Sequence, residues 1–117
     1  MDRSEQVRAM GSEVRMEILR LLAQPRKHFG KQGSADPVVF GVCMTLIAEA
    51  LSVTQPTISR HLDILRRAGF IKVHKQQKWS YCTRDEKAIG AYLDWLRRQL
   101  VMLSLIHISE PTRQEAI

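Results

Sequence analysis

The chain has 117 residues, 44% of them hydrophobic, and a formal net charge of +6, which suits one domain with a modest core. No apolar run reaches the roughly 18 residues of a membrane span, and the charged N-terminus lacks the apolar core of a signal peptide. Two cysteines, Cys43 and Cys82, are too few for a disulfide framework. We therefore expect a cytoplasmic protein with no membrane partner, outside the disulfide-rich secreted classes.

The N-terminal third predicts helices. Ser12 can cap an amphipathic helix over 12–23, in which Val14, Ile18, Leu21 and Leu22 recur at helical spacing. A short helix over 4–10 can precede it, broken at Gly11, and Pro25 ends the longer one.

The next stretch, residues 24–43, is the least regular part of the chain. It holds three glycines and two prolines, which indicates a long loop with a short extended piece at 38–42. Thr45 is then expected to cap a short helix whose buried residues would be Leu46, Ile47, Ala50 and Leu51.

The segment LSVTQPTISRHLDILRRAGF, residues 51–70, predicts a helix with two different faces. Thr54 can cap it and Pro56 fits its first turn, whereas Gly69 can end it in the left-handed conformation. Its buried stripe, at spacing i, i+4, i+7, consists of Ile58, Leu62 and Leu65. The other face carries serine, arginine and histidine, a composition suited to contact with another molecule.

From Phe70 the apolar period changes to two, which predicts two short strands around a basic turn at 75–78. Thr83 and Glu86 have the spacing of a capping box and are expected to open the last helix. That helix carries a heptad seam, typical of a helix that packs against a second copy of itself. The candidate dimer residues are Ile89, Tyr92, Leu93, Leu96 and Leu100, and Leu103 continues the seam.

Positive charge is concentrated in the same region. Residues 54–84 carry seven cations against one carboxylate, Asp63, while the rest of the chain is close to neutral. Such a basic segment is typical of proteins that bind a polyanion, although a merely solvated basic face would have the same charge. Two short helices joined by a tight turn and followed by a basic hairpin predict a winged helix-turn-helix, whose second helix fits the major groove of double-stranded DNA.

The expected DNA contacts follow from side-chain chemistry. Thr54 and Thr57 can reach phosphates, Gln55 can pair with adenine, and Arg60 can pair with guanine. The hairpin tip can follow the backbone or enter the minor groove. The candidate DNA-binding residues are Thr54, Gln55, Thr57, Ser59, Arg60, His61, Lys75, Gln76, Gln77 and Lys78.

The segment SVTQPTISRHLDILRRAGFIKVHKQQKWSYC resembles the ArsR/SmtB-type winged helix-turn-helix repressors of bacteria, and GSEVRMEILRLLA is similar to an upstream helix of that family. The matching positions are Thr54, Ser59, His61, Leu62, Leu65, Ala68, Gly69 and Ile71. The resemblance covers about residues 7–103. It implies a mainly α fold with a small β-hairpin, dimerising through terminal helices, and a homodimeric repressor released from its operator by a small effector or a redox signal. We expect residues 1–103 to form the DNA-binding domain and residues 104–117 to be a non-native or disordered tail.

The sensor part of the family pattern is absent from this sequence. Metal-sensing members carry a Cys-x-Cys pair or histidine and acidic ligands, whereas this chain offers Cys43 without a ligand set, so no metal or cofactor is expected. Cys43 is a candidate redox residue, and its alternative is a small buried hydrophobe. His61 has two readings, a structural or phosphate-contacting residue and a base reader.

The alternative to a DNA-binding regulator is a winged-helix module that binds an acidic protein without sequence-specific DNA binding. An enzyme is not expected, because the chain has no glycine-rich phosphate loop and no evident nucleophile with a base.

Overall fold

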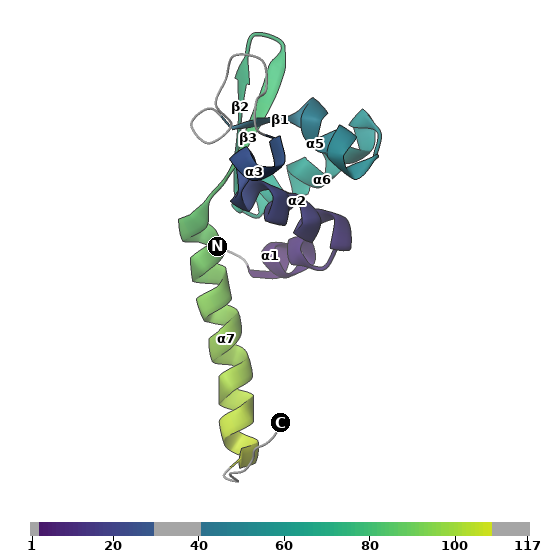
Figure 1. The fold of residues 1–117 in the computed structure, drawn as a ribbon. Helices are drawn as coiled ribbons and strands as arrows, with labels where there is room; N and C mark the ends of the chain where they lie inside the picture. Colours follow the sequence, from purple (N-terminus) through teal and green to yellow (C-terminus); the bar gives the residue numbers. More distant parts are fainter. Residues whose placement is uncertain (1–2, 30–40, 109–117) are drawn as a thin grey trace. The chain divides into compact units, whose positions relative to one another are not determined.

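The computed structural model describes residues 3–29 and 41–108, with side chains placed through residue 101. It divides into two units, residues 1–86 and 87–117, which are treated separately. The elements of the first unit (Figure 1) are, in order, α1 (Arg3–Met10), α2 (Glu13–Ala23), α3 (Pro25–Phe29), β1 (Val42–Cys43), α5 (Met44–Leu51), α6 (Gln55–Arg67), β2 (Ile71–Gln76) and β3 (Trp79–Arg84).

The core of the first unit lies where α2, α5 and α6 pack together and against the sheet. Its fully buried side chains include Ile18, Val42, Ile47, Ile58, Leu65, Phe70 and Cys82. Burying one Ile, Leu or Phe side chain contributes about 1.5–3 kcal/mol, so this set holds the helices and the sheet as one body. The buried stripe predicted for α6, including Leu62, is confirmed.

The helices at the N-terminus begin where the sequence predicts. The Ser12 hydroxyl accepts a hydrogen bond from the Arg15 amide at 3.2 Å and so caps α2. The prediction that residues 24–43 begin with a loop is wrong, because Pro25 opens the short helix α3. Proline is well suited to a first helical position, where its missing N–H has no partner to lose. Residues 30–40 of that stretch lie outside the described residues.

The three strands form an antiparallel sheet in the order β1-β3-β2. Val42 pairs with Cys82 and Cys43 with Tyr81, so the hairpin gains a third strand at its base. The extended piece predicted at 38–42 overlaps β1 only at Val42; Gly41 precedes the strand, and residues 38–40 lie outside the described part. Gly41 has φ +98°, and a Cβ there would lie 3.0 Å from the Cys82 carbonyl oxygen, so the close approach of the chains at this point requires glycine.

The predicted start of α5 is wrong. Thr45 lies inside the helix, and the position before its first residue is Cys43, which makes no side-chain capping bond. Because Cys43 is held in the sheet by its pairing with Tyr81, the helix begins directly where the strand ends. The predicted burial is correct for Ile47 and wrong for Ala50, which is exposed, whereas Ala48 is buried.

Both ends of α6 match the prediction. The Thr54 hydroxyl accepts a hydrogen bond from the Thr57 amide at 3.4 Å, with Pro56 in the first turn. At the other end Gly69 has φ +86°. The Gly69 amide donates to the Arg66 carbonyl and the Phe70 amide to the Leu65 carbonyl, each at 3.0 Å. This is a Schellman motif, which ends the helix and turns the chain directly into β2.

The second unit consists of α7 (Glu86–Ile108), whose first residue still belongs to the first unit. The capping box predicted for Thr83 is wrong, since β3 continues to Arg84 and the Glu86 carboxylate pairs with the Arg84 guanidinium at 2.8 Å. The helix runs past residue 103, where a tail was expected to begin, and residues 109–117 lie outside the described residues.

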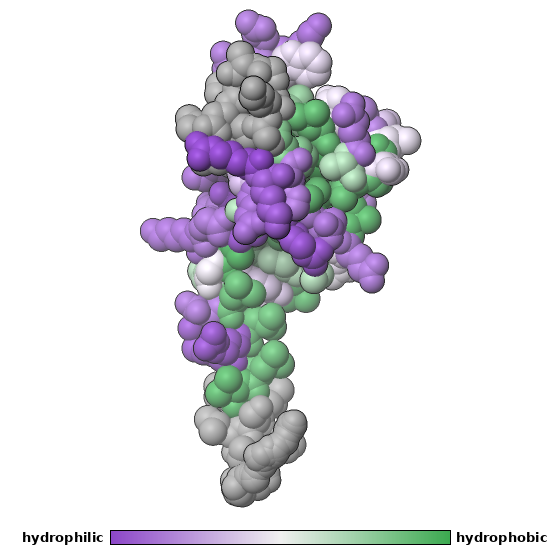
Figure 2. Space-filling model, viewed as in Figure 1, coloured by the Kyte–Doolittle hydropathy of each residue, from purple (hydrophilic) through white to green (hydrophobic). Residues whose placement is uncertain are grey.

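The predicted seam of α7 has exposed apolar members. Leu93 and Leu100 are 51% and 57% exposed, whereas Ile89 and Tyr92 are buried and Leu96 is half-buried. Hydrophobic side chains run along the visible face of α7 beside a hydrophilic cluster (Figure 2). An exposed apolar row of this kind favours contact with another molecule.

Candidate nucleic-acid interface

The polar face of α6 is directed to solvent. Thr54, Gln55, Ser59 and Arg60 are exposed, and Thr57 is half-buried at the start of the helix. The Thr54 hydroxyl donates to the Thr57 hydroxyl at 3.0 Å. The first turn of α6 therefore presents oriented hydroxyl groups and a helix N-terminus, both of which suit a phosphate oxygen.

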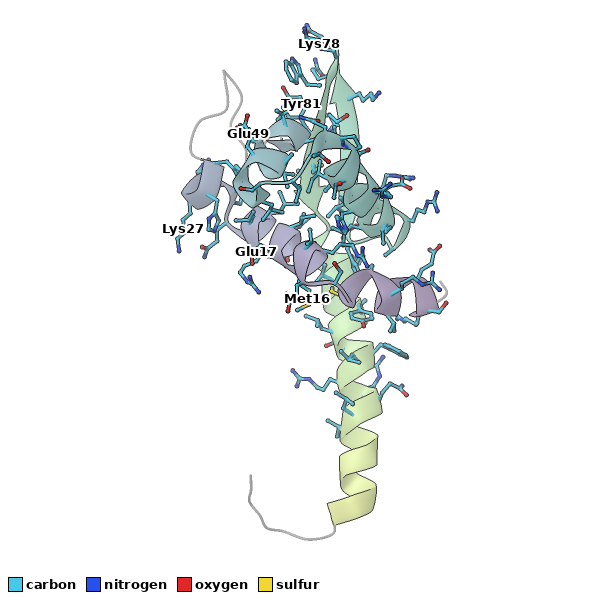
Figure 3. The ribbon with its side chains drawn as sticks, turned by 90° about the vertical axis from the view of Figure 1, so that its right-hand side faces the viewer. Met16, Glu17, Lys27, Glu49, Lys78 and Tyr81 are labelled. Atoms are coloured by element: carbon cyan, nitrogen blue, oxygen red, sulfur yellow. The ribbon has the colours of Figure 1, made fainter. Side chains whose placement is uncertain are left out.

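The hairpin tip carries the predicted wing residues. Lys75, Gln76, Gln77 and Lys78 are all exposed. The turn between β2 and β3 consists of Gln77 and Lys78, with Gln77 in a left-handed conformation at φ +58°. Lys78 projects from the tip and Tyr81 lies nearer its base (Figure 3). A narrow tip with long polar side chains fits a groove or a phosphate backbone.

A groove of about 270 Å³ separates α6 from the hairpin. Its apolar floor includes Leu62, Val73 and Cys82, while its polar lining comes from both elements, namely Ser59, Asp63, Arg66, Lys75 and Ser80. The helix and the wing thus form two walls of one concave surface. Donors from both walls face the same space, which a phosphate chain could follow.

Ion pairs divide the cations of this segment into two groups. Arg66 and Arg67 contact the Asp63 carboxylate at 2.7 and 3.0 Å, and the hydrogen bond from Arg66 lowers the pKa of Asp63. Arg84 turns away, donating to the Leu19 carbonyl at 2.9 Å and pairing with Glu86. Within the part of the chain that the structure describes, no ion pair involves Arg60, Lys75 or Lys78. Positive charge available to a ligand is therefore centred on these three residues.

His61 lies at the edge of the exposed face and contacts Arg15 of α2. Its Nδ1 atom is 3.0 Å from Nη1 of Arg15. Arg15 also donates to the Ala9 carbonyl at 2.9 Å and to the Arg8 carbonyl at 3.1 Å. Burial, and then the charges of Arg15 and Arg60, lower the pKa of His61. The imidazole is partly buried and its neutral form is favoured; its role, structural or phosphate-contacting on one side and base reading on the other, stays a prediction.

Two residues at this surface were missed by the sequence analysis. Arg15 lies within the helix predicted over 12–23, and its contact with His61 spans 46 positions of the chain, so no local pattern could reveal it. Trp79 directly follows the basic turn predicted at 75–78; it is 42% exposed, with Lys78 Nζ 5.5 Å from its ring centroid. An exposed aromatic residue next to a basic turn is a signal that could have been used.

Of the two thiols, Cys82 contributes to the apolar floor of the groove, and Cys43 does not line it. Cys43 and Cys82 are both buried, and burial, followed by the nearby Cys43, raises the pKa of Cys82 to about 12. Among residues 3–29 and 41–101, no cluster of three or more His, Cys, Asp or Glu side chains could hold a metal ion. No helix in the described ranges is both long enough and apolar enough to cross a membrane.

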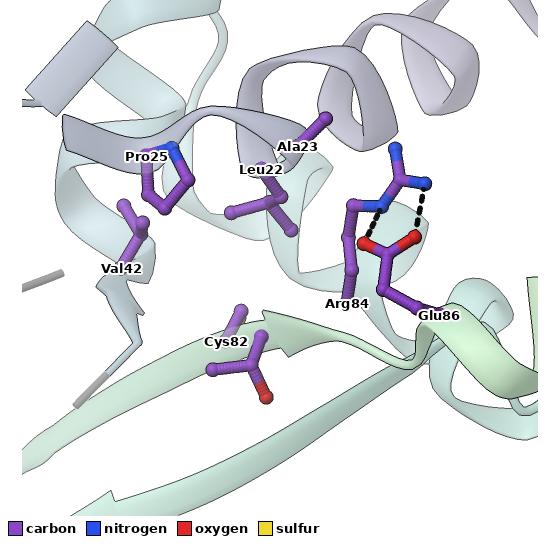
Figure 4. A pocket seen from close by; sticks show the side chains of 8 residues that line it. Leu22, Ala23, Pro25, Val42, Cys82, Arg84 and Glu86 are labelled. Carbon is purple, nitrogen blue, oxygen red and sulfur yellow. Dashed lines mark hydrogen bonds and ion pairs between the residues drawn. The ribbon is translucent and has the colours of Figure 1, made fainter. Parts of the chain in front are cut away.

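A second cavity, also of about 270 Å³, is lined by residues of α2, α3, β1 and β3 (Figure 4). Leu22, Pro25 and Val42 form its apolar side, and the Arg84–Glu86 ion pair lies at its polar end. It therefore combines apolar walls with a charged pair at one end.

The tight turn between α5 and α6, the exposed polar face of α6 and the basic hairpin define a winged helix-turn-helix protein. The model of the arsR family of bacterial regulatory proteins matches residues 43–73. The HTH-type transcriptional regulator YbzH of Bacillus subtilis (strain 168) is 39% identical over 100 residues, which cover 86% of this chain and 100% of YbzH. The chain belongs to the ArsR family of transcriptional regulators.

Further relatives agree with this family assignment. The HTH-type transcriptional regulator MJ1325 of Methanocaldococcus jannaschii is 36% identical over 78 residues, covering 67% of this chain and 72% of MJ1325. The crystal structure of an ArsR family transcriptional regulator superposes with a TM-score of 0.65 at 18% identity, over 86% of this chain and 94% of that one. HlyU from Vibrio cholerae gives a TM-score of 0.56 at 22% identity, over 82% and 88% of the two chains. These two structures are similar in fold, so the predicted winged helix-turn-helix architecture is confirmed.

Proposed function

We propose that this protein is a sequence-specific DNA-binding repressor that acts in the cytoplasm as a homodimer and is released from its operator by a small effector. The observation that carries the proposal is the groove between α6 and the wing, which has Ser59 and the Asp63–Arg66 ion pair on one wall and Lys75 on the other. Arg60 and Lys78, which no described ion pair involves, add charge at the helix and at the wing tip. This distribution matches what a phosphate backbone and a base edge require.

Two observations support the dimer: the exposed apolar residues of α7 and the short length of DNA that one copy can contact. A helix of 13 residues such as α6 spans about 20 Å, at about 1.5 Å per residue, so one copy contacts only part of a turn of DNA. The exposed Leu93 and Leu100 lie seven residues apart on α7, which places them on one face of a heptad seam. Two copies joined by this seam would bind an inverted repeat.

The structure supports release from the operator by a small ligand better than release by a redox signal. The cavity of Figure 4 has room for a small molecule between its apolar wall and the Arg84–Glu86 pair. A redox signal would need a thiolate at Cys43, but Cys43 is only 9% exposed and the neighbouring Cys82 is held as a thiol by burial.

The test is binding of the purified protein to duplexes from its own upstream region, in a salt titration, with its mass in solution measured alongside. We expect a dimer that prefers one inverted repeat over a scrambled duplex and shows a steep salt dependence. The variant Leu93→Glu/Leu100→Glu should be monomeric and bind the repeat weakly, while Gln99→Glu, at an exposed position of the same helix, should behave as the parent.

The alternative function is a winged-helix module that docks an acidic protein through the same basic face. It predicts that affinity is the same for all duplexes and that Arg60→Ala and Lys78→Ala leave DNA binding unchanged. Either result would exclude the sequence-specific repressor and direct the search to protein partners.

A further inference from the structure

The link between Arg15 and His61 has a chemical consequence for DNA binding. A guanidinium group has only donors, so the 3.0 Å contact between Arg15 Nη1 and His61 Nδ1 requires Nδ1 to be the acceptor. A neutral imidazole with an acceptor at Nδ1 carries its hydrogen on Nε2. Arg15 therefore selects one of the two tautomers of His61 and fixes the plane of the ring.

The position of His61 on α6 indicates what a hydrogen on Nε2 could do. Thr54, Thr57 and His61 follow the spacing i, i+3, i+7, which places them on one flank of the helix. The two threonine hydroxyls are already hydrogen-bonded to each other at 3.0 Å. The Nε2–H donor of His61, separated from Nδ1 by one ring carbon, would add a third polar group to this flank of the helix.

We propose that His61 donates its Nε2 hydrogen to a DNA phosphate and that Arg15, on α2, is the positioning residue that makes this donor available. This inference rests on the proposed DNA-binding function and adds a residue that lies outside the recognition helix and the wing. Arg15 also holds the carbonyls of Arg8 and Ala9 at the end of α1, so the ring is oriented by a rigid support rather than by a mobile side chain.

Two variants of His61 distinguish the role of Nε2 from that of Nδ1. The amide nitrogen of glutamine reaches about as far as Nε2, whereas asparagine is shorter and reaches only the Nδ1 position. We expect His61→Gln to bind the operator duplex within about threefold of the parent and His61→Asn to lose about tenfold, the effect of one hydrogen bond to a charged group. Equal losses in both variants would overturn the role of the Nε2 donor.

A double-mutant cycle tests the role of Arg15. Arg15→Met should weaken operator binding by about tenfold when His61 is present and should have no further effect in the His61→Gln background. Arg20→Met is the matched control, since it removes the same charge from α2 at an exposed residue paired with Glu17. If Arg15→Met weakens binding equally in both backgrounds, Arg15 has a purely structural role and the proposal is overturned.

The tautomer can be measured without DNA. Nitrogen-15 NMR of the parent should show a protonated Nε2 and an unprotonated Nδ1 at His61, and Arg15→Met should give a mixture of the two tautomers. A parent with the hydrogen on Nδ1 would overturn the assignment even if DNA binding is normal. Conversely, the expected tautomer in a protein that does not discriminate between duplexes would reject the proposed function and leave the Arg15–His61 link intact. If Arg15→Met does not fold, the comparison of His61→Gln with His61→Asn still decides the matter.

Discussion

The recognition helix α6 and the wing of β2 and β3 form the two walls of one groove, but they hold their polar groups in different ways. On α6, Thr54 and Thr57 bond to each other and His61 bonds to Arg15. On the wing, Lys75 and the three residues after it are long, exposed side chains.

This difference has a consequence for binding. Fixing a long side chain such as lysine or glutamine costs about 1.5–2 kcal/mol of rotamer entropy, whereas a side chain already held in place loses little. The ordered flank of α6, whose three groups are expected to contact phosphates, is therefore suited to fixing the position of the helix, so that Arg60 meets one base edge. The wing is suited to charge-driven affinity that depends on salt rather than on sequence. Each prediction below tests one part of this division.

The largest effect is expected at Arg60. Its replacement by alanine should weaken binding to the operator by about 10- to 100-fold, because a bidentate contact with guanine contributes about 1–3 kcal/mol of discrimination. Binding to a scrambled duplex should change much less. Fluorescence anisotropy with both duplexes measures the difference.

The control for Arg60 is Arg67→Ala, which removes a cation of the same helix that is already paired with Asp63. It should change both affinities only slightly. Equal losses of Arg60→Ala on the two duplexes would mean that Arg60 acts by charge alone, and the helix would then be no more selective than the wing.

The next largest effect is expected at Gly69, which connects the recognition helix to the wing. Gly69 has φ +86° at the point where α6 turns into β2, and an alanine in this conformation costs about 1–2 kcal/mol. Gly69→Ala should therefore lower the free energy of unfolding by this amount in a denaturant titration. The matched control is Gly90→Ala within α7, where an added Cβ meets nothing within 4 Å. Because alanine is the better helix former, that variant should gain up to about 1 kcal/mol. A loss in both variants would show that the effect is not due to the left-handed conformation.

The fold could be predicted from the sequence where local interactions decide it, and not where interactions between distant residues decide it. The ends of α6 were predicted correctly because Thr54, Pro56 and Gly69 act on backbone groups only a few residues away. The start of α5 and the start of α7 were predicted incorrectly. At α5, the pairing of Cys43 with Tyr81 lets the helix begin directly after β1, ahead of the expected cap Thr45. At α7, β3 continues through the expected cap Thr83, which pairs with Lys72.

For the site, sequence analysis predicted the types of residue at the surface but could not predict their partners. Exposed Gln55, Arg60 and Lys78 follow from the helical period and the hairpin pattern. The pairing of Arg66 with Asp63 is a helical neighbour contact and could have been inferred. The turning of Arg84 toward Leu19 and the bond between Arg15 and His61 depend on tertiary packing, for which the sequence has no local signal.

A smaller effect is expected at the wing. Lys78→Ala should lower the salt slope of binding by about one unit, since one phosphate contact is lost. The loss of affinity should be the same for the operator and for a scrambled duplex. Lys27→Ala, an exposed lysine on α3 that lies away from the hairpin tip (Figure 3), is the control and should leave the slope unchanged. A loss confined to the operator would assign base reading to the wing and contradict the division between the two walls.

The smallest effect concerns the pH dependence of stability at the ordered flank. Burial and the charges of Arg15 and Arg60 hold the pKa of His61 below its ordinary value of 6.5 in the folded protein. The unfolded chain therefore binds more protons at this site, so its contribution to stability is complete above about pH 6.5 and is lost as the pH falls through the folded pKa. His61→Gln cannot take up this proton. Urea unfolding from about pH 8 to about pH 5.5 should thus show the parent losing stability relative to His61→Gln on acidification. A difference between the two proteins that stays constant with pH would mean that Arg15 and the surrounding core do not hold the imidazole neutral, and the rigid flank of α6 would then lack one of its three fixed groups.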